Sequence, residues 1–277
     1  LFLSPSTQEY NPYVTTGNEE YWMNRLADAM TPYLETSGIN VSRNDPAGTV
    51  GNSIRMSNAG NYDFHLALHS NASPPATSGQ QAGIDLYYYP SSAPALRMAN
   101  ILADNLRPIY PQPEKVRTLA TTSLVEVRAT RAPAVLAELG YHDNPQDAQW
   151  IENNLQTIAR ALATGVCEYF GLPLLSPGEV RNAVVSTDGS NLNLRGGPSA
   201  TAPVLQKVPD HASVEVLGES GGWYVIRYDG LVGYVLGNYL LFLCSDTRAG
   251  GCDSTSPSIQ PTGLPQTGHV SAAVFAV

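Results

Sequence analysis

Two short apolar segments, each ending in a polar residue that can do chemistry, constrain the fold of this chain most strongly. Residues 63–73 read DFHLALHSNAS and residues 135–144 read VLAELGYHDN, so that His69 closes the first apolar run and Glu138 the second. In open α/β sheets, ligands bind outside the carboxyl ends of the strands. An imidazole and a carboxylate delivered to that edge can form a zinc hydrolase site if further ligands converge on it.

The first part of the chain alternates strand and helix signals. Asn18 is a suitable N-cap for a helix whose apolar stripe includes Trp22, Leu26 and Met30. Such alternation predicts an α/β domain with a largely parallel sheet flanked by helices. The expected strands cover residues 1–3, 39–42, 64–69, 84–89 and 134–138, and the expected helices cover residues 19–36, 93–105 and 147–170.

The pattern changes after residue 172. Residues 173–180 are expected to be a linker, and residues 181–243 contain short strands with a period near two, separated by Gly, Asp and Asn turns. This pattern predicts a small all-β barrel. Residues 244–277 are rich in Ser, Thr, Pro and Gly, a composition typical of a disordered tail. The predicted domains are therefore residues 1–172 and 181–243.

Composition restricts the class of protein. The 277 residues carry a net charge of −9, only 14% of them are charged, and no basic run occurs, which argues against a nucleic-acid partner. No apolar stretch approaches the roughly 20 residues that span a bilayer. The abundance of Tyr, Gly and Pro is typical of an extracellular protein. No signal peptide is visible, so we expect Leu1 to be a processing boundary.

The three cysteines differ in their expected roles. Cys167 lies in a helical pattern and is expected to pack as a small apolar residue. Cys244 and Cys252 flank a Gly-containing loop, and the sequence leaves open whether they form a disulfide, which would suit an oxidising exterior.

Residues 1–172 resemble the zinc-dependent N-acetylmuramoyl-L-alanine amidases of the type-3 family. The resemblance rests on LALHSNAS around His69, on NEEYWMNRLA at residues 18–27, on Gly83 before IDLYYY, and on PAVLAELGYHDNP around Glu138. It implies that His69 and Glu20 bind zinc and that Glu138 is the catalytic glutamate. Glu19 is the competing candidate for the glutamate ligand.

One loop departs from the family's pattern. The family has a histidine in the loop after the first strand, whereas this chain has SPSTQEYN at residues 4–11 and no histidine before His65. Counting from Pro5 places Thr7 at the histidine position and Gln8 beside it. We take Gln8 as the third ligand, a poorer donor than histidine. Its amide oxygen could reach zinc directly or through water.

Further residues near the predicted edge are candidates for substrate binding. These are Asn71, His142 and Arg128, with Arg131 as a second candidate for a stem-peptide carboxylate. A loop-fixing role is the alternative for His142 and Asp143. His65 shares a strand face with His69, but four strand residues span roughly 13 Å, so both cannot bind one zinc in a regular strand. We therefore expect His65 to be structural.

The second domain resembles the bacterial SH3-like domains of cell-wall hydrolases, through LNLRGGPS at residues 192–199 and GWYVIRYDGLVGYV at residues 222–235. Near the end, LPQTG at residues 264–268 resembles a sortase signal, without the long apolar run and basic tail that such a signal needs. The oligomeric state is not indicated.

Together the resemblances imply a secreted or wall-bound zinc enzyme that cuts the amide between N-acetylmuramic acid and L-alanine in bacterial peptidoglycan. Two alternatives remain. The chain could be a wall-binding protein that has lost activity with the missing histidine, or a zinc peptidase that cuts another amide.

Overall fold

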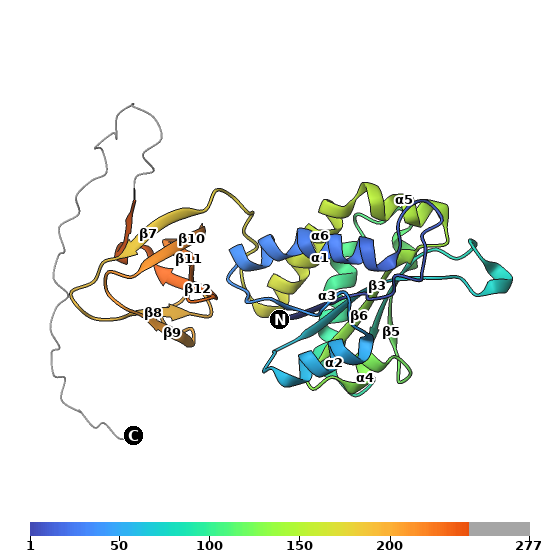
Figure 1. Ribbon diagram of the computed structural model, residues 1–277, viewed down its shortest axis with the longest axis horizontal. Coiled ribbons are helices and arrows are strands. Elements are labelled where there is room, and N and C mark those ends of the chain that lie inside the picture. Colours follow the sequence, from blue (N-terminus) through green and yellow to red (C-terminus); the bar gives the residue numbers. More distant parts are fainter. Residues whose placement is uncertain (244–277) are drawn as a thin grey trace, which may run out of the picture. The chain divides into compact units, whose positions relative to one another are not determined.

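The computed structural model describes residues 1–243. The predictions for Cys244, Cys252 and LPQTG fall outside these residues and stay predictions. The described chain contains an N-terminal sheet with helices on both faces and, after residue 180, an all-β unit (Figure 1). No helix in residues 1–243 has the length and apolar character needed to cross a membrane.

The N-terminal sheet has six strands in the order β2-β1-β3-β6-β4-β5. Strands β4 and β5 run antiparallel to the others, because β4 pairs antiparallel with β6 and parallel with β5. The expectation of a largely parallel sheet is therefore wrong, and the sheet is mixed. A strand that runs parallel to an earlier one needs a crossover connection to the opposite edge of the sheet, usually a helix. Only a loop with one 3₁₀ turn joins β3 to β4, so β4 starts at the edge where β3 ends and runs in the opposite direction. The strands are β1 (Phe2–Pro5), β2 (Ser42–Arg43), β3 (His65–Asn71), β4 (Ile84–Tyr88), β5 (Val116–Ala120) and β6 (Ala134–Tyr141).

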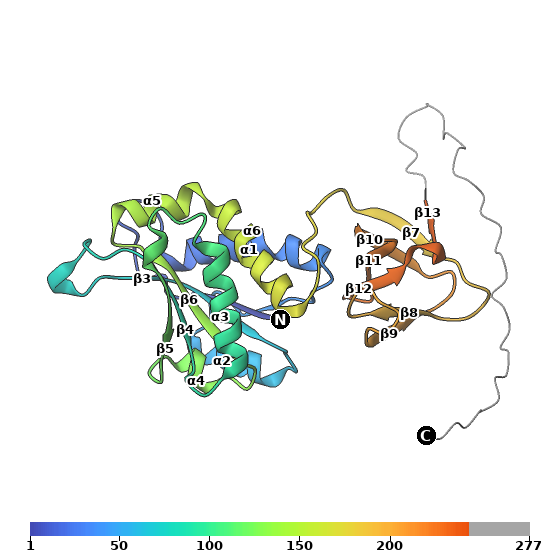
Figure 2. The same ribbon diagram turned by 180° about the vertical axis from the view of Figure 1, so that it is seen from behind.

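Helices cover the two faces of this sheet unequally. Four helices pack on one face around the main apolar core, and two lie on the other face, where α4 covers a small cluster of Ala67, Val127 and Leu136 (Figures 1 and 2). The main-face helices are α1 (Glu19–Thr36), α3 (Ala93–Leu106), α5 (Pro145–Asn153) and α6 (Leu155–Phe170); those on the other face are α2 (Val50–Ala59) and α4 (Val125–Ala129).

The helix boundaries follow from local chemistry. Asn18 caps α1 by accepting a hydrogen bond from the Tyr21 backbone N–H, as its residue type predicts. The single helix expected over residues 147–170 is instead two helices, α5 and α6, separated at Asn154. Gly171 ends α6 with φ at 69°, a left-handed conformation that glycine adopts easily. Cys167 is a buried free thiol in α6, as expected.

The C-terminal unit is one antiparallel sheet of seven strands in the order β13-β7-β10-β11-β12-β8-β9. Alternate residues of its strands form a separate buried cluster that includes Val185, Leu194 and Val216, which confirms the predicted all-β unit. Its strands are β7 (Arg181–Val185), β8 (Leu192–Arg195), β9 (Val204–Val208), β10 (Ser213–Ser220), β11 (Trp223–Tyr228), β12 (Leu231–Leu236) and β13 (Leu240–Phe242).

Candidate active site

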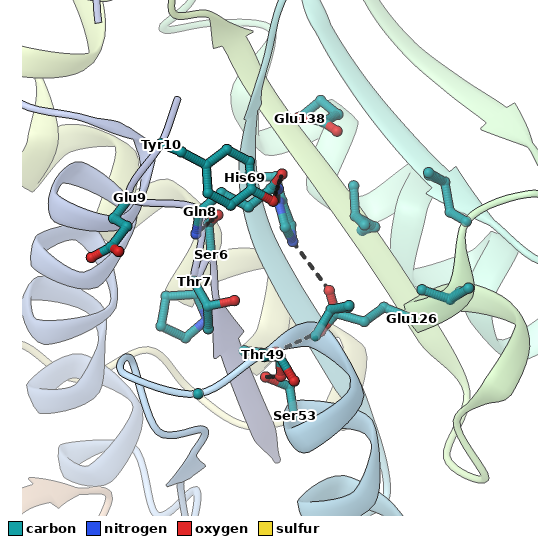
Figure 3. Close-up of a pocket in the computed structure, with 17 residues that line it drawn as sticks. Ser6, Thr7, Gln8, Glu9, Tyr10, Thr49, Ser53, His69, Glu126 and Glu138 are labelled. Atoms are coloured by element: carbon teal, nitrogen blue, oxygen red, sulfur yellow. Dashed lines mark hydrogen bonds and ion pairs between the residues drawn. The ribbon is translucent and has the colours of Figure 1, made fainter. Parts of the chain in front are cut away.

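His69, near the carboxyl end of β3, lies between two carboxylates. Its Nδ1 is 2.8 Å from Glu19 Oε1 and its Nε2 is 3.1 Å from Glu126 Oε2. Only 8% of His69 is exposed. Burial disfavours the charged ring, but the bonds to Glu126 and Glu19 outweigh it and raise the pKa of His69 well above its usual value. Figure 3 shows the ring beside Gln8, with Glu126 on its other side.

Glu19, not Glu20, meets His69. Glu19 is 1% exposed at the first position of α1 and belongs to the buried stripe that continues through Met23 and Met30. Burial favours its neutral form, but hydrogen bonds with His69 and Asn11 hold the pKa of Glu19 below its usual range. Glu20 points elsewhere and accepts a hydrogen bond from Asn24 Nδ2 at 3.2 Å. Glu19 lies four residues before Met23 and seven before Leu26, so the helical period of the buried stripe is the sequence signal that favours Glu19 over Glu20.

Gln8, rather than Thr7, lies at the His69 ring. Its Nε2 is 3.3 Å from His69 Nδ1 and 3.5 Å from Glu19 Oε1. Asn11 fixes this orientation, because its Nδ2 donates both to Glu19 Oε2 at 2.6 Å and to Gln8 Oε1 at 3.2 Å. The amide of Gln8 therefore turns its nitrogen towards the ring and its oxygen away.

Glu138 lies next to His69 on the neighbouring strand β6, in direct register with it. Its Oε2 is buried and has no hydrogen-bond partner within residues 1–243. Burial raises the pKa of Glu138 to about 7; His69 opposes the rise, and the charges of Glu19, Asp85 and Glu126 add to it. A carboxyl group with this pKa can both take and give a proton near neutral pH.

Glu126 is a site residue that the sequence analysis missed. It is 3% exposed on α4, a helix of five residues, too short to show a helical period. The one signal was an isolated carboxylate among the apolar residues of SLVEV. Burial favours its neutral form, but hydrogen bonds from His65 and His69 lower the pKa of Glu126 far below its usual range.

Most of these groups line one pocket of about 470 Å³ (Figure 3). Gln8, His69, Glu126 and Glu138 contribute to its wall, whereas Glu19 lies behind His69, and Asn71, His142 and Arg128 do not line the pocket. Arg128 lies with Arg131 in a separate hollow beside the first residues of β6, at the strand end remote from Glu138. A substrate contact for these residues stays a prediction without support from this geometry.

Asn71, His142 and Asp143 hold backbone near the site. His142 Nδ1 lies 2.9 Å from the Ser70 carbonyl oxygen, and the Asn71 carbonyl accepts from the His142 backbone N–H at 2.8 Å. Asp143 accepts from the Ser73 backbone at 3.0 Å and from the Gly79 backbone at 2.7 Å. The loop-fixing alternative fits these contacts.

A row of polar side chains extends from His69 across the sheet. Register places Glu138 beside His69, Asp85 beside Glu138, and Arg117 beside Asp85. Paired residues on neighbouring strands share a face, so the four lie on the face that carries the pocket. Arg117 binds Asp85 through Nε at 2.7 Å and Nη2 at 2.9 Å while 51% of its side chain stays exposed. The sequence analysis did not single out Arg117.

Comparison with known proteins agrees with this architecture. A family model described as N-acetylmuramoyl-L-alanine amidase matches residues 9–168, more than half of the chain. The chain belongs to this amidase family. A second model, described as bacterial SH3 domain, matches residues 190–240.

Individual amidases are distant from this chain. The amidase CwlM of Bacillus licheniformis is 25% identical over 146 residues, which cover 52% of this chain and 54% of CwlM. The chain thus matches about half the length of this curated relative. The structure of amidase AmiC2 of Nostoc punctiforme aligns with a TM-score of 0.52 at 18% identity, covering 61% of this chain and 96% of AmiC2. The catalytic domain of CwlV from Bacillus (Paenibacillus) polymyxa var. colistinus aligns with a TM-score of 0.53 at 18% identity, covering 62% and 98%. These structures support the fold.

The zinc that this resemblance implies can be tested against the side chains of the amidase domain. Tetrahedral zinc with bonds of about 2.0–2.1 Å places its ligand atoms about 3.3 Å apart. The atoms of Glu19, His69 and Gln8 that face one another are 2.8, 3.3 and 3.5 Å apart, which fits one face of such a site. The chemistry of Glu19 and His69 fits as well, whereas Gln8 must turn its amide to offer oxygen. Across residues 1–243, no group of three or more His, Cys, Asp or Glu side chains is arranged to hold a metal, so a site here depends on Gln8.

Proposed function

We propose that this chain hydrolyses the amide bond between N-acetylmuramic acid and L-alanine in bacterial peptidoglycan, with zinc held by Glu19, His69 and Gln8. The observation that carries the proposal is Glu138, whose unpartnered oxygen and pKa of about 7 lie in register with His69 on the wall of the pocket. Glu19 replaces Glu20 in this assignment because Glu19 contacts the His69 ring.

Amide hydrolysis requires an activated water and a proton for the leaving nitrogen. Glu138 supplies both by accepting the proton of the water and then donating it to the amine, for which a pKa near the working pH is suited. Zinc, when bound, supplies Lewis acidity that polarises the substrate carbonyl. The wall of the pocket formed by Leu124, Val125 and Leu136 gives the substrate an apolar contact beside these polar groups.

The C-terminal unit supports the choice of substrate. Its match to the bacterial SH3 model leads us to propose that it binds the bacterial wall and keeps the catalytic domain on its polymer. A location outside the cell or in the cell wall follows from the same proposal.

One observation favours the alternative of an inactive wall-binding protein. Gln8 is held with its nitrogen towards His69, and an amide nitrogen does not bind zinc. The two functions are separated by activity with zinc present. We favour the enzyme because turning the Gln8 amide gives up no contact shorter than 3.2 Å. Its oxygen loses the bonds from Asn11 and Tyr10 at 3.2 Å, and its nitrogen loses the contacts with His69 and Glu19 at 3.3 and 3.5 Å.

Digestion of purified peptidoglycan tests the proposal. We expect the full chain with added zinc to release stem peptides with a free L-alanine amino group, identified by mass analysis. Glu138→Gln removes the proton acceptor and should lower the rate about 10²–10⁴-fold, whereas Glu179→Gln, at an exposed position, should not. Absence of new L-alanine ends from the folded, zinc-supplemented protein would support the wall-binding alternative.

The pH dependence follows from the same glutamate. Glu138 must be ionised to accept a proton, so kcat/KM should fall as the pH drops below the pKa of Glu138, which is about 7 without metal and which a bound cation would lower. Folding raises the pKa of Glu138 from 4.5 to about 7. The protonated carboxyl group therefore contributes its full stabilisation below pH 4.5, and this contribution is lost as the pH rises from there through about 7. Thermal unfolding of the metal-free protein between pH 5 and pH 9 should therefore show a decline that Glu138→Gln reduces. An equal decline in both proteins would remove Glu138 as its cause.

A further inference from the structure

Glu126 connects the candidate metal-binding histidine to a second, deeper histidine. Its Oε1 accepts a hydrogen bond from Ser4 Oγ at 2.6 Å and lies 3.2 Å from His65 Nε2. Its Oε2 lies 3.1 Å from His69 Nε2. His65 Nδ1 in turn lies 2.9 Å from Ser57 Oγ, so every member of the network has a partner. Ser4, Ser57, His65, His69 and Glu126 are all more than nine-tenths buried.

The position of Glu126 determines which nitrogen of His69 carries hydrogen. An ionised carboxylate can only accept, so the His69 Nε2 that faces it must donate. The other nitrogen, Nδ1, faces Glu19 and Gln8. Without a metal it also faces a carboxylate, but a cation bound between Glu19 and Gln8 would displace the proton of Nδ1 and leave the proton of Nε2 hydrogen-bonded to Glu126. The same contact fixes the rotation of the ring, since both nitrogens are held from opposite sides.

A purely structural role explains only half of these contacts. Bonds from Ser4 and His65 to Oε1 would fasten α4 to β1 and β3 without any contact to His69. The bond from Oε2 reaches the site, and burying a carboxylate for packing alone is costly when an apolar residue can fill the space. Metal-binding histidines commonly donate their second N–H to a carboxylate, which orients the ring and increases its basicity.

We propose that Glu126 is a positioning residue that holds His69 in the tautomer and orientation in which Nδ1 binds zinc. The proposal rests on the proposed zinc site, but its test does not depend on hydrolysis. In this proposal, Glu126 on α4 strengthens His69 as a zinc ligand. This gain in metal affinity offsets the weak donor Gln8, which faces the other nitrogen of the His69 ring.

Zinc affinity of the full chain, measured by competition with a chromogenic chelator, tests this assignment. Loss of such outer partners commonly weakens metal binding 10–100-fold, and we expect this loss for Glu126→Leu. Glu126→Gln keeps the size and one acceptor but removes the charge, so a loss of about three- to tenfold is expected. Ser4→Ala is the matched control, because it removes a partner of Oε1 and leaves the bond to His69 intact.

Nitrogen-15 NMR of the zinc-loaded protein reads the tautomer directly. In the unmodified chain we expect a protonated Nε2 on His69, with its proton shifted downfield by the carboxylate, and an unprotonated Nδ1. Glu126→Gln should move this proton upfield, and Ser4→Ala should not. If Glu126→Leu fails to fold, Glu126→Gln decides. Zinc affinity and His69 resonances that stay unchanged in folded Glu126→Gln would overturn the proposal. A chain that binds zinc with these signatures but cuts no peptidoglycan would overturn the proposed function alone.

Discussion

Among single residues, Gln8 is the weakest donor of the three groups proposed to bind zinc. It occupies the right place, within 3.5 Å of both Glu19 and His69, but offers an amide where a ring nitrogen would be a better ligand. Its affinity for the metal also competes with the hydrogen bond from Asn11. The metal affinity of the chain should therefore depend strongly on this position.

Gln8→His should tighten zinc binding at least tenfold, or about 1.4 kcal/mol, because a neutral imidazole supplies the missing nitrogen donor. Chelator competition at pH 7.5 measures the change. Thr7→His is the matched control, since Thr7 lines the same pocket but makes no hydrogen bond to His69 or Glu19 in the described chain. Equal affinities for Gln8→His and the unmodified chain would show that Gln8 does not face the metal.

The sequence predicted the placement of side chains at the pocket where a motif ended a strand, and did not where a shift of one residue changes the direction of a side chain; the roles of these residues stay predictions. His69 and Glu138 were predicted and lie in register. Glu20 was preferred to Glu19 by spacing, although neighbouring helical residues point about 100° apart, and only Glu19 lies on the buried stripe. Glu126 could not be found, because its partners lie 57, 61 and 122 residues away along the chain.

At the level of elements, strands β4 and β5 extend the site beyond the pocket. Asp85 and Arg117 continue the row from His69 and Glu138, and Asp85 uses two of the nitrogens of Arg117. The Arg117 side chain nevertheless stays 51% exposed, and a guanidinium is suited to binding a carboxylate. The stem peptide of the proposed substrate carries carboxylates, so these strands are where we expect a contact with the leaving peptide of the proposed reaction.

Arg117→Gln should raise KM about five- to tenfold with little change in kcat, because the contact contributes to binding rather than to the reacting bond. Kinetics with a soluble muramoyl peptide measure this separation. Arg128→Gln, on the remote hollow, is the control and should leave KM unchanged. A fall in kcat with unchanged KM would place Arg117 in support of Glu138 instead.

The helices and strands of the first domain that the sequence analysis did not predict are α2, α4 and β5, which are short or lack an apolar period. The buried residues of α2 are Ser53 and Ser57, so its helical period has no hydrophobic signal. Helix α4 is one turn long. The direction of β4 was missed for a different reason, since an apolar strand reads the same in either direction, and only the loop before it distinguishes the two.

In the whole described chain, the all-β unit is joined to the first domain by specific contacts. Tyr234 is completely buried, and its hydroxyl donates to the Ser37 carbonyl at 2.9 Å. The side chain of Asn40 bonds the backbone of Val232 in both directions, at 2.8 and 2.9 Å. Leu172 and Leu175, from the segment around the expected linker, pack beside Tyr234. Sequence periodicity did not reveal this interface, because single residues from separate elements form it.

Tyr234→Ala should destabilise the C-terminal end of α1, although Tyr234 is 197 residues away from Ser37 along the chain. Removing a fully buried aromatic side chain costs about 3–5 kcal/mol, and here the loss also frees the carbonyl of Ser37 next to the hydrogen bonds that close α1. Hydrogen exchange should speed up at the amides of Ser37, Gly38 and Ile39, which bond back to that last turn. Tyr239→Ala, at an exposed position of the same unit, is the control and should not change their exchange. If Tyr234→Ala destabilised only the all-β unit and left these amides protected, the two parts would fold independently, and the SH3-like unit would not stabilise the helix that carries Glu19.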